Sequence, residues 1–111
     1  MIENAKRYDL WWARVAYEDK PSISKIRPVL IIDQQICVIL ALKVTSHDKR
    51  ENFWGEYGIK RWRQAGLSKP STIRMSKLLK LEKCDFTDKI GTLHIVDIVA
   101  VEKCIERIYR N

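Results

Sequence analysis

The stretch SKIRPVLIID, Ser24–Asp33, carries an unbroken apolar run from Pro28 to Ile32. Such a run is typical of a strand that is buried on both faces of a sheet. Pro28 occupies the first position of the run, where a strand tolerates the missing amide hydrogen. An arginine, Arg27, stands directly before it. The sequence therefore raises the question whether Arg27 is a solvated charge at a strand end or serves a chemical purpose.

A second apolar run, ICVILALKVTS (Ile36–Ser46), follows after only Gln34 and Gln35. Two long strands joined by so short a connection are expected to form an antiparallel hairpin at the centre of the sheet. In that hairpin the start of the first run lies beside the end of the second. We therefore expect Arg27 and Thr45 to be close in space.

Other segments around this hairpin also indicate strands. The aromatic-rich segment Asp9–Tyr17 predicts a first strand, and polar loops are expected at Glu18–Lys25 and His47–Asn52. Further along, we predict a strand around Tyr57–Arg63, then a turn and a strand at Ser71–Ser76, followed by a short edge strand.

The last third of the chain is expected to be helical in two places. Thr87 is a candidate N-cap for a single helical turn that Gly91 would close. A longer C-terminal helix is predicted with Asp97 as its N-cap, because apolar residues recur there every three or four positions. This apolar stripe consists of Ile98, Val101, Cys104, Ile105 and Ile108. The order of elements predicts a mainly β, or α+β, small barrel with a C-terminal helix, in one domain of residues 1–111.

The composition limits the class of protein. A chain of 111 residues with 46% hydrophobic residues suits one modest globular core. The sequence holds no apolar run long enough to span a membrane and no signal-peptide core, so a cytoplasmic location is expected. The net charge of +7, from 21 basic and 14 acidic residues, favours a polyanion or an acidic protein as partner, although it also serves solubility.

Cysteine and histidine are placed unfavourably for a metal site. His47 and His94 are the only histidines, and the cysteines, Cys37, Cys84 and Cys104, have no C-x-x-C spacing. We expect reduced thiols, no metal and no cofactor.

The residues at the expected hairpin end suit phosphate chemistry. An arginine fork binds a phosphate in bidentate fashion and stabilises charge that develops on it. Thr45 and Ser46 would offer hydroxyls, and His47 titrates near neutral pH and would serve as acid or base. This set suits metal-free cleavage of an RNA phosphodiester by its own 2′-hydroxyl.

Each of these residues also has an ordinary structural explanation. Arg27 would be a solvated strand-end charge, and His47 only a loop residue. Thr45 and Ser46 would end a strand by bonding to their own backbone. Arg74 alternates with apolar neighbours, as any exposed strand residue does.

The sequence contains four tryptophans, which are a second candidate feature for binding RNA. The segment FWGEYGIKRWR, Phe53–Arg63, mixes aromatic and basic side chains, so Trp54 or Trp62 could stack on bases. Core or dimer packing explains these tryptophans equally well. Trp11 and Trp12 point to opposite faces of one strand, so we expect one of them in the core.

The segments YDLWWARV, RPVLII, VILALKVTS, GLSKPSTIRMSKLLKLE and DKIGTL, in this order, resemble the MazF/PemK toxins of type II toxin–antitoxin systems. The resemblance covers Tyr8–Tyr109. It implies an SH3-like barrel with a C-terminal helix, as in MazF, PemK and CcdB, and a homodimer. It further implies a metal-independent endoribonuclease that cuts single-stranded RNA at a short sequence and leaves 2′,3′-cyclic phosphate and 5′-hydroxyl ends. The implied partner is an antitoxin with an acidic, apolar tail.

The resemblance also assigns residues. The family's catalytic arginine and threonine fall on Arg27 and Thr45. Arg74 matches a catalytic arginine of some branches, but Ser76 stands where those branches carry an aspartate. The candidates for the general base are His47, Glu18 and Asp19, and the sequence does not decide among them. Candidate RNA-binding residues are Lys25, Ser46, Lys49, Arg50 and Trp54.

The chain departs from the family pattern at Tyr8, where the family usually has glycine before Asp9. We expect a different turn there, because tyrosine lacks the conformational freedom of glycine. Two other functions stay open. A barrel of this fold could poison DNA gyrase through the C-terminal segment IERIYRN, or it could bind RNA without cutting it, as the replacement at Ser76 would allow.

Overall fold

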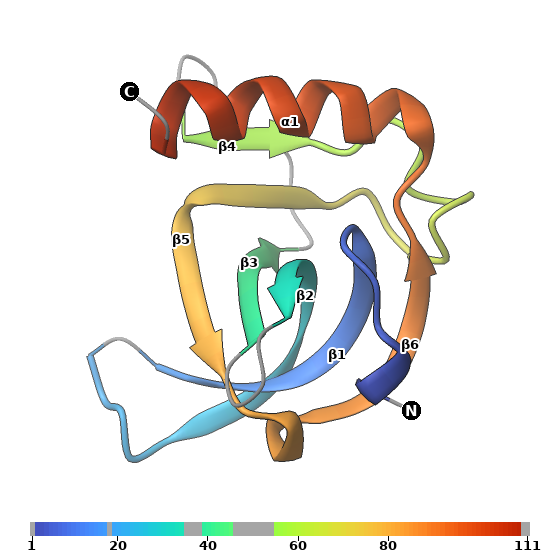
Figure 1. Cartoon of the computed structure of the whole chain (residues 1–111). Helices are drawn as coiled ribbons and strands as arrows, with labels where there is room; N and C mark the ends of the chain where they lie inside the picture. Colours follow the sequence, from blue (N-terminus) through green and yellow to red (C-terminus); the bar gives the residue numbers. More distant parts are fainter. Residues whose placement is uncertain (1, 18, 35–38, 46–54, 110–111) are drawn as a thin grey trace.

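The computed structural model describes residues 2–17, 19–34, 39–45 and 55–109. One antiparallel sheet of six strands, in the order β4-β5-β3-β2-β1-β6, packs against a single C-terminal helix (Figure 1). The strands are β1 (Asp9–Ala16), β2 (Ser24–Gln34), β3 (Ile39–Thr45), β4 (Glu56–Gly58), β5 (Thr72–Leu81) and β6 (Phe86–Thr92). The helix is α1 (Ile95–Tyr109), and the short 3-10 helices are η1 (Ile2–Asn4) and η2 (Lys83–Asp85).

The two long apolar strands lie at the centre of the sheet, as predicted. Leu30 and Leu42 belong to one buried cluster, which faces α1, whereas Val29, Ile31 and Ala41 belong to a second cluster on the other face. All five are 0% exposed. Because successive side chains of a strand point to opposite faces, a strand that buries both must be apolar throughout.

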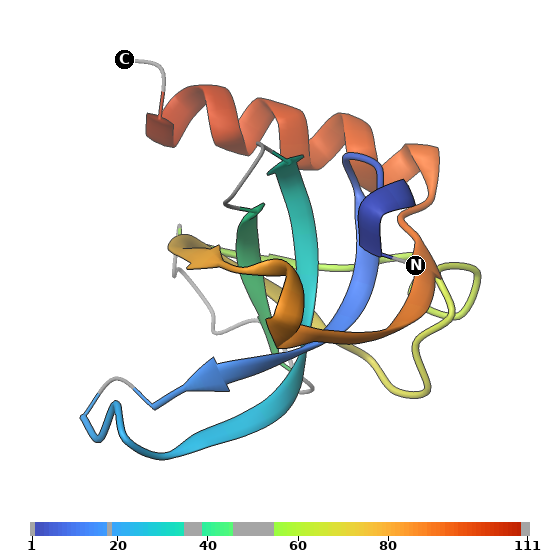
Figure 2. The same cartoon turned by 60° about the horizontal axis from the view of Figure 1, so that its bottom comes forward.

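Helix α1 crosses one face of the sheet (Figures 1 and 2). The predicted stripe is confirmed: Val101 is fully buried, and the other stripe residues pack against the same cluster. The helix begins at Ile95, so Asp97 lies in its first turn and is not its N-cap. In the part of the chain that the structure describes, no helix has the length and apolar character needed to cross a bilayer.

The α+β class with a C-terminal helix is confirmed. The sheet curls strongly, but among the described residues its edge strands β4 and β6 do not pair with each other, so the barrel is open.

The segment predicted as a strand at Tyr57–Arg63 is mostly a turn. Strand β4 ends at Gly58, and the chain then folds back through bonds from the Ala65 amide to the Arg61 carbonyl and from the Gly66 amide to the Arg63 carbonyl. The physical reason is the carboxylate of Asp97, which accepts hydrogen bonds from two consecutive amides of this turn.

The predicted division into a strand at Ser71–Ser76 and a separate edge strand is also wrong. Strand β5 is continuous and lies between β4 and β3. Its register with β3 jumps from Leu42↔Leu78 to Lys43↔Arg74, so extra residues of β5 bulge at this point. The bulge bends the strand, which Figure 1 shows in yellow.

Residues Thr87–Gly91 form no helical turn. They belong to β6, which pairs with β1 at the edge of the sheet. The short helical element precedes them, at Lys83–Asp85. Pairing with β1 decides this conformation, and it cannot be read from the local sequence.

Tyr8 adopts the backbone conformation that glycine would supply, with φ at 74°. Its amide donates to the Ile31 carbonyl, and its carbonyl accepts from the Leu93 amide. The ring is buried, and the hydroxyl donates to Glu102 on α1 over 3.1 Å. The prediction of a different turn at this position is therefore wrong. The left-handed conformation costs a tyrosine about 1 kcal/mol, and the contacts of the Tyr8 backbone and side chain offset this cost.

Candidate functional site

A cavity of about 460 Å³ opens where β2 begins and β3 ends. It is lined by Trp12, Ile26, Arg27, Pro28, Val44, Thr45, Gly66, Leu67, Ser68, Lys69, Ser71, Lys89 and Ile90. The predicted meeting of Arg27 and Thr45 is confirmed, since both line this one cavity.

The antiparallel register explains why the two residues meet. Val29 and Lys43 are direct partners across β2 and β3. Arg27 precedes Val29 by two residues, and Thr45 follows Lys43 by two, so both lie on the same face of the sheet. Both are half-buried.

One wall of the cavity depends on a tight contact between two glycines and the backbone. The segment Gly66–Ser71 packs on β6 so closely that a Cβ on Gly91 would lie 2.1 Å from the Ala65 carbonyl oxygen. A Cβ on Gly66, whose φ is +95°, would lie 2.5 Å from the Ile90 oxygen. Glycine is required at both positions, and this contact places Ser68 and Lys69 opposite the end of β3.

The cavity carries positive charge. Arg27, Lys69 and Lys89 line it, and no carboxylate does so among the described lining residues. The Lys89 Nζ lies 3.6 Å from Asp9 Oδ2. Asp9 also accepts from the Lys6 amide and the Thr92 hydroxyl, each over 2.9 Å, so it keeps a structural role. A concave cationic surface with hydroxyls suits a phosphate-bearing ligand.

Arg27 itself contacts an aromatic ring. Its guanidinium carbon lies 6.0 Å from the centroid of the Tyr17 ring. Such a contact orients an arginine without neutralising its charge.

Arg74 shares the sheet face of Arg27 and Thr45 but lies outside the described cavity lining. It is the direct partner of Lys43 and of Glu56. Its Nε lies 3.3 Å from Glu56 Oε2, and the side chain of Glu56 is fully buried. This ion pair stabilises the join between β4 and β5.

The other predicted site residues fall into two groups. Lys25 is exposed on β2 and does not line the cavity. The remaining predicted residues lie outside the described residues: Ser46, His47, Lys49, Arg50 and Trp54.

Sequence reasoning missed several residues of the cavity. Trp12, Lys69 and Lys89 were not predicted as site residues, although all three line it. The signal for Trp12 was present, because the alternation with Trp11 predicts that one of them faces outward. Trp62, a candidate for stacking, is instead half-buried against the core, with the Arg63 guanidinium carbon 4.9 Å from its ring centroid.

A second polar cluster is structural. The buried carboxylate of Asp97 accepts from the Tyr57 hydroxyl over 2.6 Å and from the amides of Lys60 and Arg61 over 2.9 Å each. Burial, followed by the hydrogen bond to Asp97, raises the pKa of Tyr57 well above its usual value. All of these polar groups find partners within the chain, so the cluster fastens α1 to the turn at residues 60–66.

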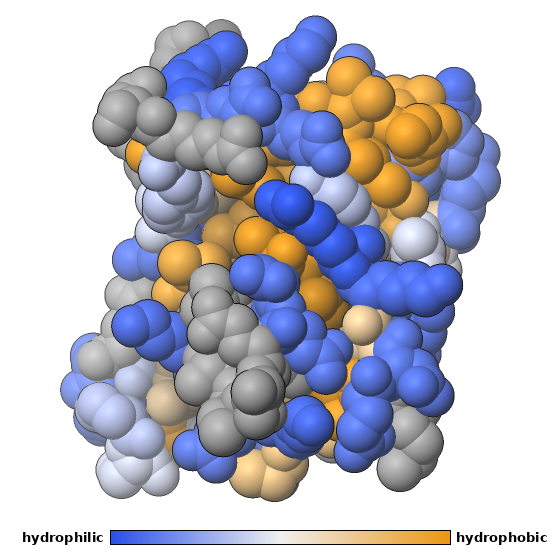
Figure 3. Space-filling model, in the orientation of Figure 1, coloured by the Kyte–Doolittle hydropathy of each residue, from blue (hydrophilic) through white to orange (hydrophobic). Residues whose placement is uncertain are grey.

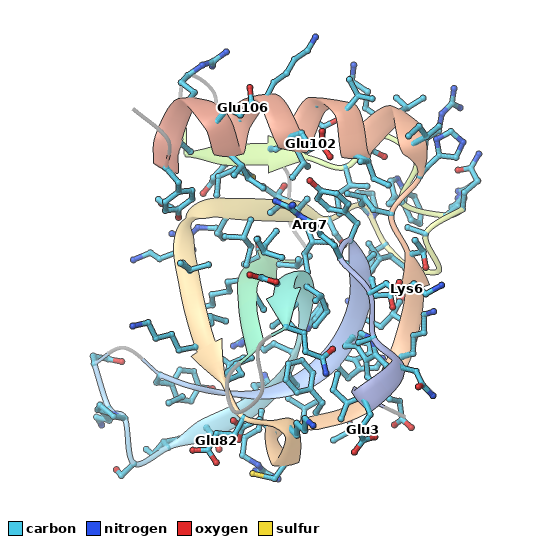
Figure 4. All side chains as sticks on the ribbon, viewed as in Figure 1. Glu3, Lys6, Arg7, Glu82, Glu102 and Glu106 are labelled. Carbon is cyan, nitrogen blue, oxygen red and sulfur yellow. The ribbon has the colours of Figure 1, made fainter. Side chains whose placement is uncertain are left out.

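A third polar cluster lies beneath α1, where Figure 4 shows Arg7 next to Glu102. A cavity of about 150 Å³ is lined by Arg7, Glu102, Ile105 and Glu106. The Arg7 guanidinium carbon lies 5.3 Å from the centroid of the Tyr8 ring. Opposite charges face each other here, so the cluster holds the N-terminal segment against α1.

The structure shows no group of three or more His, Cys, Asp and Glu side chains that could hold a metal ion among residues 2–17, 19–34, 39–45 and 55–109.

The fold and the cavity define a small α+β protein with a cationic cavity at the ends of its central strands. Residues 6–109 match the family of PemK-like, MazF-like toxins of type II toxin–antitoxin systems. The chain belongs to this family. No curated protein sequence matches it.

Solved structures share the fold. A Mycobacterium tuberculosis toxin, MazF-mt6, superposes with a TM-score of 0.70 at 20% identity, over 92% of this chain and 96% of that one. An endoribonuclease from a mycobacterial species, in complex with its cognate antitoxin, gives a TM-score of 0.72 at 12% identity, over 93% of this chain and 92% of that one.

Proposed function

We propose that this protein is the toxin of a type II toxin–antitoxin system and acts as a sequence-specific, metal-independent endoribonuclease on single-stranded RNA. The observation that carries this proposal is the cationic cavity that Arg27 and Thr45 line together. Membership of the toxin family supports it, as does a neighbour of the same fold that is described as an endoribonuclease.

In the proposed reaction, the 2′-hydroxyl oxygen of one nucleotide attacks the adjacent phosphorus. The new O2′–P bond closes a 2′,3′-cyclic phosphate, and the broken P–O5′ bond releases a 5′-hydroxyl. The Arg27 guanidinium stabilises the charge that develops on the phosphoryl oxygens. The Thr45 hydroxyl hydrogen-bonds the same phosphate.

Two further residues complete the proposal. His47 takes the proton from the 2′-hydroxyl or returns one to the leaving oxygen, a role that its residue type supports. Arg74 would contribute positive charge from the same sheet face, with its ion pair to Glu56 limiting its reach. Lys25, Ser46, Lys49, Arg50 and Trp54 would bind the RNA around the cut.

The partners follow from the charge. A net charge of +7 and the cationic cavity suit both RNA and an antitoxin with an acidic tail that covers the same surface. A neighbour of the same fold is described in complex with its cognate antitoxin. We propose that residues 1–111 act as one domain in a cytoplasmic homodimer, without a cofactor.

The test is to incubate the antitoxin-free protein with a long RNA of mixed sequence in excess EDTA and to map the product ends. Discrete cuts that leave 2′,3′-cyclic phosphate and 5′-hydroxyl ends are expected. Intact RNA with protein that circular dichroism shows to be folded would contradict the proposal and would favour a gyrase poison or an RNA-binding protein that does not cut.

A further inference from the structure

We propose that Trp12 forms the base-binding wall of this cavity and stacks on the base next to the phosphate that Arg27 holds. This inference rests on the proposed function and names a residue that positions the RNA strand. It assigns a role to a large aromatic side chain that the fold leaves 39% exposed.

The contrast between two neighbouring tryptophans supports the inference. Trp11 is 4% exposed and packs edge-on against Phe86, with the ring centroids 6.3 Å apart. Trp12 points to the opposite face and is 39% exposed. Leaving so large an aromatic surface in water forgoes the stabilisation that burial would bring, so its exposure inside a cavity favours a ligand contact.

Trp12 and Arg27 reach the same cavity from neighbouring strands. Trp12 is the direct partner of Pro28 across β1 and β2, and Pro28 follows Arg27 in the chain. Because successive side chains of a strand alternate, Trp12 and Pro28 project to one face of this strand pair and Arg27 to the other. Trp12 and Arg27 both line the cavity that opens at this end of the strands, so one RNA strand in the cavity can contact both.

The cavity lining combines apolar and polar residues. Ile26, Pro28 and Ile90 line it with Trp12, and Thr45 and Ser71 line it with Arg27. Single-stranded RNA is recognised by this combination of stacking platforms and cationic groups.

The Trp12 backbone is held from both neighbouring strands. Pro28 of β2 is its partner on one side, and on the other the Thr87 hydroxyl of β6 lies 3.4 Å from its carbonyl oxygen. A platform on a paired strand keeps its place before RNA arrives, which lowers the cost of ordering the ligand.

The experiment uses a short RNA that spans a cut mapped with the wild-type protein. A 2′-O-methyl group on the attacking nucleotide prevents cleavage, so that the dissociation constant can be measured for wild type, Trp12→Ala and Trp12→Phe. Ile23→Ala is the matched control, because Ile23 is 47% exposed but does not line the cavity. Each protein is also measured with an abasic residue on either side of the scissile phosphate.

We expect Trp12→Ala to weaken binding about 10-fold, Trp12→Phe to weaken it less than about 3-fold, and Ile23→Ala to have no effect. An abasic residue at the stacked position should weaken wild type about as much and should weaken Trp12→Ala no further. Such non-additivity would not arise from a merely structural role.

Three results would overturn the proposal. If wild type cleaves and binds RNA while Trp12→Ala binds equally well, only the stacking role fails. If Trp12→Ala loses affinity for an acidic antitoxin tail but not for RNA, Trp12 is a protein contact. If wild type neither cuts nor binds RNA, the proposed function fails together with this inference.

Discussion

Asp97 and Arg27 are both charged residues next to apolar core, and they differ in where their partners lie. Asp97 is 0% exposed, and its carboxylate accepts three hydrogen bonds from the turn and from Tyr57. Arg27 lines an open cavity, and no carboxylate from the described part of the chain pairs with it. A charge whose partners are internal stabilises the fold, whereas a charge that faces a cavity is available to a ligand.

The apolar residues show the same contrast. Figure 3 shows an apolar patch at the N-terminal end of α1, where Ile95 and Val99 are 61% and 48% exposed. The residues of this patch do not line the cavity, whereas Trp12 lines it together with Arg27, Lys69 and Lys89. Exposure alone therefore does not identify a site, and the shape and charge around it do.

The largest expected effect is the loss of stability on replacing Asp97, the charged residue whose partners are internal. Asp97→Ala should lower the free energy of unfolding by about 4 kcal/mol, because it leaves two buried amides and a phenol without their acceptor. Urea denaturation measures this loss. Asp97→Asn, which keeps one acceptor oxygen, should lose less, and an unchanged midpoint for Asp97→Ala would contradict the structural role.

On the functional side, Arg27→Ala should slow RNA cleavage about 100- to 1000-fold, because the developing phosphoryl charge loses its partner. The unfolding free energy should stay within about 0.5 kcal/mol of wild type. Arg14→Ala is the control, since Arg14 lies on the neighbouring strand and contacts Ser24 outside the cavity lining. Wild-type cleavage by folded Arg27→Ala would remove Arg27 from the mechanism.

Gly91→Ala is expected to affect both the stability of the fold and the shape of the cavity. The added Cβ would meet the Ala65 carbonyl, so we expect a loss of about 2 kcal/mol and a displaced cavity wall with slower cleavage. Thermal unfolding and cleavage rates test this. Gly66→Ala should act in the same direction, whereas Ser76→Ala, at an exposed position of β5, should change neither quantity.

The smallest effect concerns Tyr57 and alkaline pH. Because the pKa of Tyr57 is raised in the folded state, its contribution to stability is complete below the usual tyrosine value of 10.0 and is lost as pH rises above it. Wild type should therefore lose stability more steeply above about pH 10 than Tyr57→Phe does, by up to about 1.4 kcal/mol per pH unit. Near pH 7 the variant should cost about 1 kcal/mol. Parallel pH profiles from urea denaturation would contradict this account.

Much of the fold could be predicted from apolar periodicity. The central hairpin and the stripe of α1 depend on burial patterns that reach over many residues, so they were predicted correctly. The strand β6 was mistaken for a helical turn, because Thr87 and Gly91 are equally compatible with a helix end and with an edge strand. Only pairing with β1 separates the two, and pairing is not a local property.

The candidate site was predictable in part for the same reason. Antiparallel pairing of neighbouring strands brings Arg27 to Thr45 once the hairpin is known. Lys69 and Lys89 reach the cavity through contacts between segments far apart in the chain, such as the one between Gly91 and Ala65. Nothing in the local sequence distinguishes these lysines from solvated ones.

The sequence alone determined which strands are central and which face of α1 is buried, because hydrophobic burial requires a matching apolar period along the chain. It also determined that an arginine near the start of one strand lies beside a threonine at the end of the other. The tertiary structure decided the rest. It holds Tyr8 in a left-handed conformation through contacts with Ile31, Leu93 and Glu102, and it turns Trp12, rather than Trp11, toward the cavity. These outcomes depend on the balance of contacts from distant segments, and that balance exists only once the chain is folded.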